Sequence, residues 1–457
     1  MSRNGRQKRK VVGMAAVSRV SRLVDGVRNS LWFSAALTAV LLGTGLWAIY
    51  EFVPYMWLFL FTNFVFIYVA VFYMLKYWEE KPEKLSDKFP ALTVIVSAYN
   101  EEDKISECLK MVKAMKYPRP IEILVVDDAS KDGTYAKLKK IAGIKVIRNA
   151  KNIGKGASLN MAIRRAKGEL IATVDADSYP APDALMKMVP HFNSERVGAV
   201  IALVCANKPR NLLERIQEIE YFVSFGFWHT AFAKMDALLV TPGPLSVYSK
   251  KALVKIGGFE PGNITEDMEI ALHLQDAGYR ICCNTDAKIY TDVPSTVGAW
   301  YRQRLRWLRG KIYNGFKYHH MIFDSEHGDF GRFVYPVSFL VEALGVVFVL
   351  RLLLLHGSNL FSMVAGAVGV ANVNAAILYD PNFYVAAATI NSSLFFFAFA
   401  VLLWSYVTWI SFKIARQKLS LFHLLPLAVY LTFYSMFISM VYFSSAVHEF
   451  VGTRRDW

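Results

Sequence analysis

Cysteine and charge are both scarce in this chain of 457 residues. Four cysteines are present, with no CxxC pair and no histidine spaced to complete a zinc site, so the sequence predicts no zinc centre. They indicate reduced structural thiols of a cytosolic domain, and a vicinal redox pair at Cys282 and Cys283 is the alternative. Charged residues make up 19% of the chain and hydrophobic residues 54%. This composition excludes a disordered chain and argues against an ordinary soluble globule.

Two nucleotide-binding motifs are missing as well. The segment around Lys155 has Asn149 where a P-loop needs its first Gly, and Gly156 where it needs Ser or Thr. No GxGxxG follows the first predicted strand, which excludes the NAD fingerprint. Lys155 nevertheless stands at a predicted helix start, where phosphate binds readily. An exposed lysine without a function is the alternative interpretation.

The charge that is present is mainly basic. Lysine and arginine number 52 against 37 acidic residues, a net charge of +15. A membrane protein with a basic cytoplasmic side explains both this excess and the apolar composition. Nucleic-acid binding would explain the charge alone, so the sequence predicts no nucleic-acid partner.

Long uncharged runs at both ends predict membrane-spanning helices. Residues 31–50 and 55–75 are each about long enough to cross a hydrocarbon core. Residues 1–30 hold eight Lys or Arg and one acid, which places the N-terminus in the cytoplasm, as a surface helix or a loose tail. Further apolar runs follow the polar centre of the chain, at 333–356, 360–379, 383–412 and 421–447. They predict three or four C-terminal spans, and the sequence leaves both this number and the side of the membrane on which the chain ends open.

The polar centre predicts an α/β domain. Strand-length apolar runs at 92–97, 122–127, 145–148 and 170–175 alternate with helical patterns, which is typical of a parallel doubly wound sheet. Ligands of such sheets bind beyond the carboxyl ends of the strands. This rule selects the polar residues that follow the strands: Tyr99, Asn100, Glu101, Asp127, Asp128, Asp175 and Asp177.

Asp175 and Asp177 are the pair with the clearest chemistry. Ser178 and two prolines follow them, so the chain turns and the two carboxylates can converge. Converging carboxylates suit Mg²⁺ or Mn²⁺, which also takes ligands from a substrate diphosphate. A solvated turn without a metal is the alternative.

Seven segments occur in an order that resembles membrane-embedded family 2 glycosyltransferases, the group of hyaluronan, chitin, cellulose and poly-N-acetylglucosamine synthases. The resemblance covers about residues 92–310 and implies a GT-A-like, Rossmann-like α/β domain between transmembrane helices. GPLSVY is most similar to hyaluronan synthases and related chitin-oligosaccharide synthases. The segments are SAYNEE (97–102), VVDDAS (125–130), NIGKGASLN (152–160), VDADS (174–178), GPLSVY (243–248), TED (265–267) and QRLRW (303–307).

The resemblance implies a donor site for a UDP-sugar. Tyr99 would stack on the uracil, Glu101 and Asp128 would line the uridine pocket, and Lys155 would contact the nucleotide. Asp175 and Asp177 would hold Mg²⁺ or Mn²⁺, with Asp177 as the more direct ligand.

The resemblance also implies an acceptor site. Asp267, beside Glu266, matches the general base, and Thr265 as a plain helix N-cap is the alternative. Gly243 and Pro244 would lie on the acceptor side. Gln303, Arg306 and Trp307 match the QxxRW signature, where the acceptor meets the donor diphosphate. For Trp307 the alternative is an aromatic belt with Trp300 and Tyr301 that anchors an interfacial helix.

The function implied is an inverting, metal-dependent glycosyltransferase in the plasma membrane, multi-pass with a cytoplasmic catalytic domain. It would extend a polysaccharide and pass it through its own spans, with membrane lipids around it and Asn391, Ser392 and Ser393 along the path. A single addition to a lipid acceptor is the alternative within the class, and a non-catalytic polymer transporter is the alternative outside it. The predicted division is a basic segment (1–30), two spans (31–76), the transferase domain (77–294), interfacial helices with QxxRW (295–332), three or four further helices (333–447) and a tail (448–457).

Overall fold

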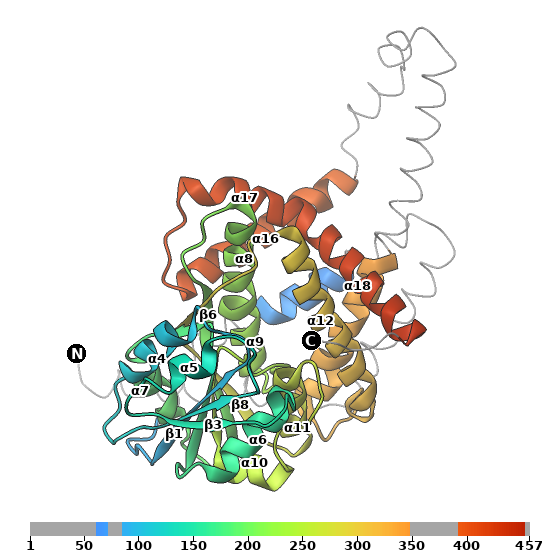
Figure 1. The fold of residues 1–457 in the computed structure, drawn as a ribbon. Helices are drawn as coiled ribbons and strands as arrows, with labels where there is room; N and C mark the ends of the chain where they lie inside the picture. The colour runs from blue at the N-terminus through green and yellow to red at the C-terminus, as the bar shows by residue number, and fades with distance from the viewer. Residues whose placement is uncertain (1–60, 72–84, 348–391, 453–457) are drawn as a thin grey trace, which may run out of the picture.

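The computed structural model describes residues 61–71, 85–347 and 392–452 (Figure 1). The predicted basic segment 1–30, the first span 31–50, the segment 360–379 and Asn391 lie outside the described residues. All four cysteines lie within them, three buried and Cys283 partly buried, and all are free thiols. Cys282 and Cys283 are not linked to each other, and the burial of the cysteines is typical of structural thiols.

One eight-stranded sheet carries the centre of the chain. Its strand order is β3-β2-β1-β4-β7-β6-β8-β5. The four strands predicted from the sequence form one half, and they are parallel. The bounds are β1 Leu92–Ala98, β2 Glu122–Asp127, β3 Lys145–Arg148, β4 Leu170–Asp175, β5 Ser178–Pro180, β6 Val197–Ala206, β7 Leu245–Ser249 and β8 Arg280–Thr291.

The expectation of an all-parallel sheet is wrong for the other half. Strand β7 runs antiparallel to both β4 and β6, and β5 runs antiparallel to β8. Only two residues separate β5 from β4, too few for the crossover that a parallel neighbour requires, so β5 pairs at the far edge of the sheet. The direction of β7 could not be derived because an apolar run has the same pattern in either direction.

Helices cover both faces of the sheet, as the doubly wound prediction requires. Alternate side chains of β1 point to opposite faces, so Val94 and Val96 pack in one core with α4 and α7, while Ile95 packs in the other with α6, α10 and α11. Both faces of the sheet are covered and mostly apolar, which explains the long apolar runs of these strands. The helices are α4 Ile105–Lys113, α5 Thr134–Leu138, α6 Lys155–Arg165, α7 Ala184–Met188, α10 Lys250–Ile256 and α11 Glu266–Asp276.

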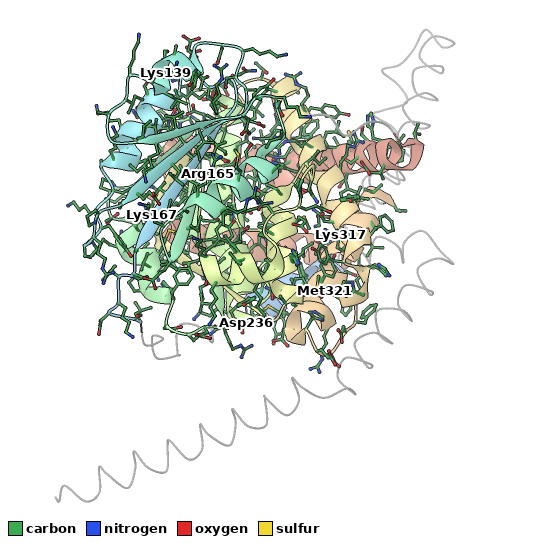
Figure 2. The ribbon with its side chains drawn as sticks, turned by 60° about the horizontal axis from the view of Figure 1, so that its bottom comes forward. Lys139, Arg165, Lys167, Asp236, Lys317 and Met321 are labelled. Carbon is green, nitrogen blue, oxygen red and sulfur yellow. The ribbon has the colours of Figure 1, made fainter. Side chains whose placement is uncertain are left out.

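A helical half adjoins the sheet. In Figure 1, α8 (Leu212–Tyr221) and α12 (Val297–Lys317) lie between the sheet and the C-terminal helices. Figure 2 shows Lys139 and Lys167 on the sheet half, and Lys317 and Met321 on the helices beyond it. The remaining elements are η1 Val189–His191, η2 Phe222–Trp228, α9 His229–Lys234, η3 His319–Met321, η4 Phe330–Val334, α16 Ser392–Ile414, η5 Leu421–His423, α17 Leu424–Val429, η6 Tyr430–Tyr434 and α18 Ser435–Val451.

Two helices in the described part of the chain are long and apolar enough to cross a membrane, Phe330–Val347 and Leu421–Glu449. They coincide with two of the predicted spans. The second is largely uncovered, with Leu421 83% and Phe422 76% exposed. A shorter apolar helix, Phe61–Val71, lies within the predicted span 55–75.

Candidate active site

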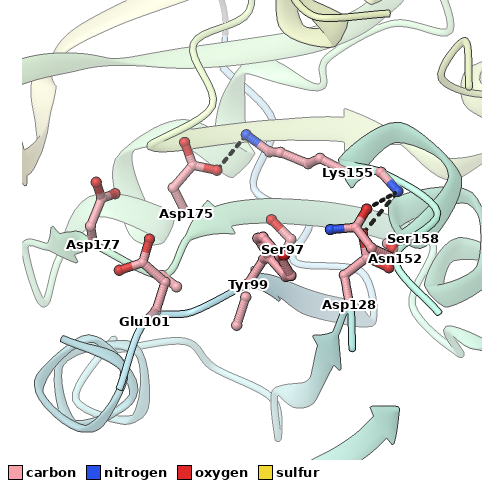
Figure 3. A pocket seen from close by; sticks show the side chains of 12 residues that line it. Ser97, Tyr99, Glu101, Asp128, Asn152, Lys155, Ser158, Asp175 and Asp177 are labelled. Carbon is pink, nitrogen blue, oxygen red and sulfur yellow. Dashed lines mark hydrogen bonds and ion pairs between the residues drawn. The ribbon is translucent and has the colours of Figure 1, made fainter. Parts of the chain in front are cut away.

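A pocket opens beyond the carboxyl ends of β1, β2 and β4, where the sequence predicted it (Figure 3). We call it the nucleotide pocket. All six residues predicted to contact the nucleotide or a metal line it, so the structure brings them together. The lining residues are Ser97, Ala98, Tyr99, Glu101, Asp128, Asn152, Gly154, Lys155, Ser158, Asp175, Ala176 and Asp177.

Two strained backbone positions shape the pocket rim. Asn100 (φ 55°) and Ala129 (φ 60°) lie just beyond β1 and β2 in the left-handed region, which costs about 1–2 kcal/mol for a residue with a side chain. The two loops are tied together, since the Asn100 amide donates to Ser130 Oγ at 3.0 Å and the Lys131 amide donates to Asn100 Oδ1 at 2.9 Å. These bonds hold Tyr99 at the rim, 41% exposed. An exposed aromatic ring there is available for stacking on a base.

Asp128 organises the loop that precedes α6. Its carboxylate is almost fully buried and accepts hydrogen bonds from the amides of Ile153 and Gly154, each at 2.9 Å. The side chain of Asn149 donates to it at 2.7 Å. Asp128 therefore lines the pocket, as expected, and also fixes the loop that presents Lys155.

Three carboxylates converge at the other end of the pocket. Figure 3 shows Glu101, Asp175 and Asp177 gathered at this end, with Asp175 directed toward Lys155. Burial and the charge of Asp177 raise the pKa of Glu101 to about 7. Burial and the charge of Asp175 likewise raise the pKa of Asp177. Burial and mutual repulsion both disfavour the ionised carboxylates, so a cation bound at this end would stabilise them.

The carboxylates at this end of the pocket fit Mg²⁺ or Mn²⁺ only if a substrate supplies further metal ligands. Within residues 61–71, 85–347 and 392–452, no three His, Cys, Asp or Glu side chains are arranged to hold a metal ion by themselves. Magnesium in particular commonly binds through one or two carboxylates and takes its other ligands from phosphate and water. Asp175 and Asp177 supply two carboxylates of that kind.

Lys155 joins the pocket to α11. Its Nζ lies 2.5 Å from Asp175 Oδ1 and 2.8 Å from Glu266 Oε1. Burial alone would lower the pKa of Lys155, but the carboxylates of Asp175 and Glu266 outweigh it and raise that pKa. Lys155 is therefore a permanent positive charge, and the alternative of an exposed helix-start lysine is excluded.

Gly243 packs directly against this ion pair. A Cβ at position 243 would lie 2.5 Å from Asp175 Oδ2 and 2.8 Å from Lys155 Nζ. A methyl group at position 243 would therefore displace the ends of both side chains. The GPLSVY segment thus contacts the donor side through Gly243, whereas the sequence assigned Gly243 and Pro244 to the acceptor.

Asp267 lies in the first turn of α11, near the same lysine. Burial and the charge of Glu266 raise the pKa of Asp267 to about 6, and Lys155 and Arg306 partly offset this. At neutral pH such a carboxylate is ionised, and its basicity suits proton abstraction.

Helix α12 brings the QRLRW segment to the TED segment. The Arg306 guanidinium donates to the Ile264 carbonyl at 3.0 Å. The side chain of Asn314 donates to Thr265 Oγ1 at 3.0 Å, and a Cβ at Gly310 would lie 2.0 Å from the same oxygen. Thr265 occupies the N-cap position of α11, but its side chain makes no capping hydrogen bond. Its hydroxyl instead fixes α12 beside Asp267.

Arg304 is the residue in this segment to which sequence reasoning assigned no role. It is 2% exposed, forms an ion pair with Glu220 of α8, and lies 4.3 Å from the centroid of the Trp307 ring. Trp300 is also buried and donates to the Tyr434 hydroxyl at 3.4 Å. Trp300 and Trp307 therefore pack inward, which argues against the aromatic belt. Glu220 carries no motif that would have identified it.

Comparisons with known proteins agree with this geometry. Residues 93–257 match the family described as Glycosyl transferase family 2. The chain is 30% identical over 235 residues to a poly-beta-1,6-N-acetyl-D-glucosamine synthase of Staphylococcus aureus (strain MSSA476), covering 50% of this chain and 57% of the relative. It is 29% identical over 238 residues to an N-acetylglucosaminyltransferase of Mesorhizobium japonicum, covering 49% and 56%. The chain thus spans about half the length of these relatives.

A solved structure shares the fold. A mannosyltransferase from Pyrobaculum calidifontis, in complex with GDP-Man and Mn²⁺, superposes with a TM-score of 0.56 at 21% identity, covering 92% of this chain and 99% of that one. At this identity the likeness concerns the fold alone, a GT-A-like domain with a mixed sheet. The prediction of a glycosyltransferase is confirmed by the family match and by the relatives. Residues 93–257 match glycosyltransferase family 2, and every residue that lines the nucleotide pocket lies within this match.

Proposed function

We propose that the protein transfers a sugar from a UDP-sugar to the hydroxyl group of a growing polysaccharide, with inversion at the anomeric carbon. One observation carries the proposal. Asp267, whose pKa is raised to about 6, feels the positive charges of both Lys155 in the nucleotide pocket and Arg306 in α12. A base and two cations at one place suit a displacement at a sugar diphosphate.

Each residue of the site has a separate role in this transfer step. Tyr99 stacks on the uracil, and the loop fixed by Asp128 presents Lys155 to the diphosphate. Negative charge develops on the departing UDP, and the fixed charges of Lys155 and Arg306 stabilise it. Asp267 takes the proton of the attacking hydroxyl group, and Trp307 offers an apolar face to the acceptor sugar.

Metal dependence belongs to the same proposal. Asp175 and Asp177 would hold Mg²⁺ or Mn²⁺, and Glu101 lies beside them. A bound ion supplies positive charge that offsets the donor diphosphate.

The donor sugar is proposed from the relatives. Two of them are named for N-acetylglucosamine transfer, which supports UDP-N-acetylglucosamine as the donor. A hyaluronan-type product rests on GPLSVY alone and would require UDP-glucuronate as a second donor.

We place the transferase domain on the cytoplasmic face of a membrane, because two apolar helices follow or adjoin it and the second exposes Leu421 and Phe422. Elongation through the spans, three or four of which would lie in 333–447, completes the proposal.

A UDP-release assay tests it. The full-length protein in lipid nanodiscs is supplied with single UDP-sugars, with and without Mn²⁺, and the product is sized. We expect UDP release with UDP-N-acetylglucosamine, loss of release on chelation, and a polymer. If the product is a single sugar on a lipid, the lipid-acceptor alternative replaces the polymer proposal. If no UDP-sugar releases UDP, a non-catalytic transporter is favoured.

A further inference from the structure

A buried arginine needs a reason in a protein with so few charges. Arg304 lies in the middle of α12, and its side chain is 2% exposed. Moving a guanidinium out of water costs several kcal/mol unless partners compensate for it. The mechanism proposed above uses Arg306 and Trp307 of this segment and leaves Arg304 without a role.

The partners that compensate Arg304 come from two distant elements. Glu220 of α8 accepts from the guanidinium, and its carboxylate is itself mostly buried. Burial alone would lower the pKa of Arg304, but Glu220 outweighs it and raises that pKa. Tyr434, from η6 in the candidate membrane helix, lies beside the pair and accepts from Trp300. The arginine is therefore charged, and its neighbours on this side are Glu220 of α8 and Tyr434 of the C-terminal helix.

The same guanidinium also contacts two residues of the QxxRW signature, Gln303 and Trp307. One Nη donates to the side-chain oxygen of Gln303. The plane of the group lies against Trp307, with its carbon 4.3 Å from the ring centroid. A guanidinium suits both contacts because it is planar, so it stacks flat on the indole while its edge donates to Gln303, whereas an ammonium group presents its donors from one point and has no flat face.

We propose that Arg304 is a positioning residue, which orients the Gln303 amide and the Trp307 indole for the acceptor and is itself fixed by Glu220. This inference rests on the proposed function for the meaning of that orientation. It also explains why α8 and the helix carrying Tyr434 pack against α12 at this point. Movement of either helix would reach the acceptor side of the site and leave the nucleotide pocket unaffected.

The experiment removes the pair without leaving a buried charge. Single variants at 304 or 220 would strand one charge and destabilise the fold, whereas replacing a buried pair with apolar residues of similar size is often neutral. We therefore use the double variant Arg304→Met/Glu220→Leu, with Arg304→Lys as a charge-preserving variant. Arg302→Met is the matched control, since Arg302 lies on the same helix and is exposed. All are made in the full chain in nanodiscs.

Transfer is measured against nucleotide binding. We expect the double variant to unfold at about the wild-type temperature and to bind UDP with unchanged affinity. Transfer should fall by roughly 10–100-fold, mainly through the acceptor KM, in line with the loss of oriented contacts. Arg304→Lys should show the same loss, and Arg302→Met none. Wild-type transfer by the folded double variant would overturn the proposal.

A spectroscopic readout separates this proposal from the proposed function. The difference between the near-ultraviolet circular dichroism of the protein and that of its Trp307→Phe variant isolates the signal of Trp307. We expect this signal to collapse in the Arg304→Met/Glu220→Leu background. If wild-type protein transfers no sugar but the signal collapses, the proposed function fails and the positioning role stands. If the signal is unchanged, the positioning role is wrong whatever the activity.

Discussion

The nucleotide pocket and the QRLRW segment of α12 are built in different ways. The pocket takes its side chains from strand-end loops between residues 97 and 177, and the bonds of Asp128 that fix one of these loops join residues 25 and 26 positions apart. The QRLRW segment is held by residues far away in sequence. Glu220 is 84 residues from Arg304, and Tyr434 is 134 residues from Trp300.

The difference indicates two sites with separate supports. The family 2 match ends at residue 257, so it includes every residue of the nucleotide pocket and neither Asp267 nor α12. A fold that binds the donor in one pocket, linked to α11 through the Lys155–Glu266 ion pair, can combine it with different acceptor elements. We therefore expect variants on the pocket side to change nucleotide binding, and variants on the α12 side to change transfer.

Asp267→Asn should have the largest effect, since Asp267 lies where the two parts meet. An amide cannot take the acceptor proton, so turnover should fall by about 10³-fold, within the usual range for loss of a general base. UDP affinity, measured by calorimetry, should change little. Asp276→Asn, at the other end of α11, is the matched control and should retain activity. Wild-type turnover by the Asp267→Asn variant would remove Asp267 as the base.

Gly243→Ala tests the pocket side. Its Cβ would lie 2.5 Å from Asp175 Oδ2, so the Lys155–Asp175 pair must move. Overpacking of this kind costs about 1–3 kcal/mol, and this cost at the UDP site corresponds to roughly 5–150-fold weaker UDP binding. Calorimetry with UDP and Mn²⁺ gives the value. Unchanged affinity would show that the pocket tolerates displacement of this ion pair.

The pocket could be predicted from sequence because its rules are local. Strand β2 and strand β4 have the bounds that their apolar runs indicated, and polar residues that follow parallel strands must meet at one edge. The six pocket residues therefore followed from strand positions and from the family resemblance together.

The rest depends on contacts that no local pattern encodes. The antiparallel direction of β7 is set by how the chain returns after α8 and α9, and an apolar run does not record direction. The ion pair of Glu220 with Arg304 joins a glutamate in an ordinary amphipathic helix to one of two arginines in QRLRW. No local pattern in the sequence decides which of these arginines faces inward.

Gly310→Ala tests the α12 side and should have a smaller effect than Gly243→Ala. The new methyl group would lie 2.0 Å from Thr265 Oγ1, so α12 must shift away from the TED segment. We expect turnover to fall by about 10-fold, because small misplacements of reacting groups are costly, with UDP affinity unchanged. Gly298→Ala on the same helix meets its nearest atom at 3.6 Å and should be neutral. Weaker UDP binding by the Gly310→Ala variant would contradict the separation of the two sites.

The pH dependence of turnover should be the smallest effect, and it again separates the two parts. The pKa of Asp267 is raised to about 6, and only its carboxylate form accepts a proton. Lowering the pH from 7 to 5.5 should therefore reduce turnover by about fourfold at saturating donor and metal, while raising it above 7 should change little. The residual turnover of Asp267→Asn should not follow this curve. Glu101 of the nucleotide pocket, with a pKa of about 7, would alter the donor KM instead. If wild-type protein and the Asp267→Asn variant show the same turnover curve, the group that controls turnover lies in the pocket and not in α11.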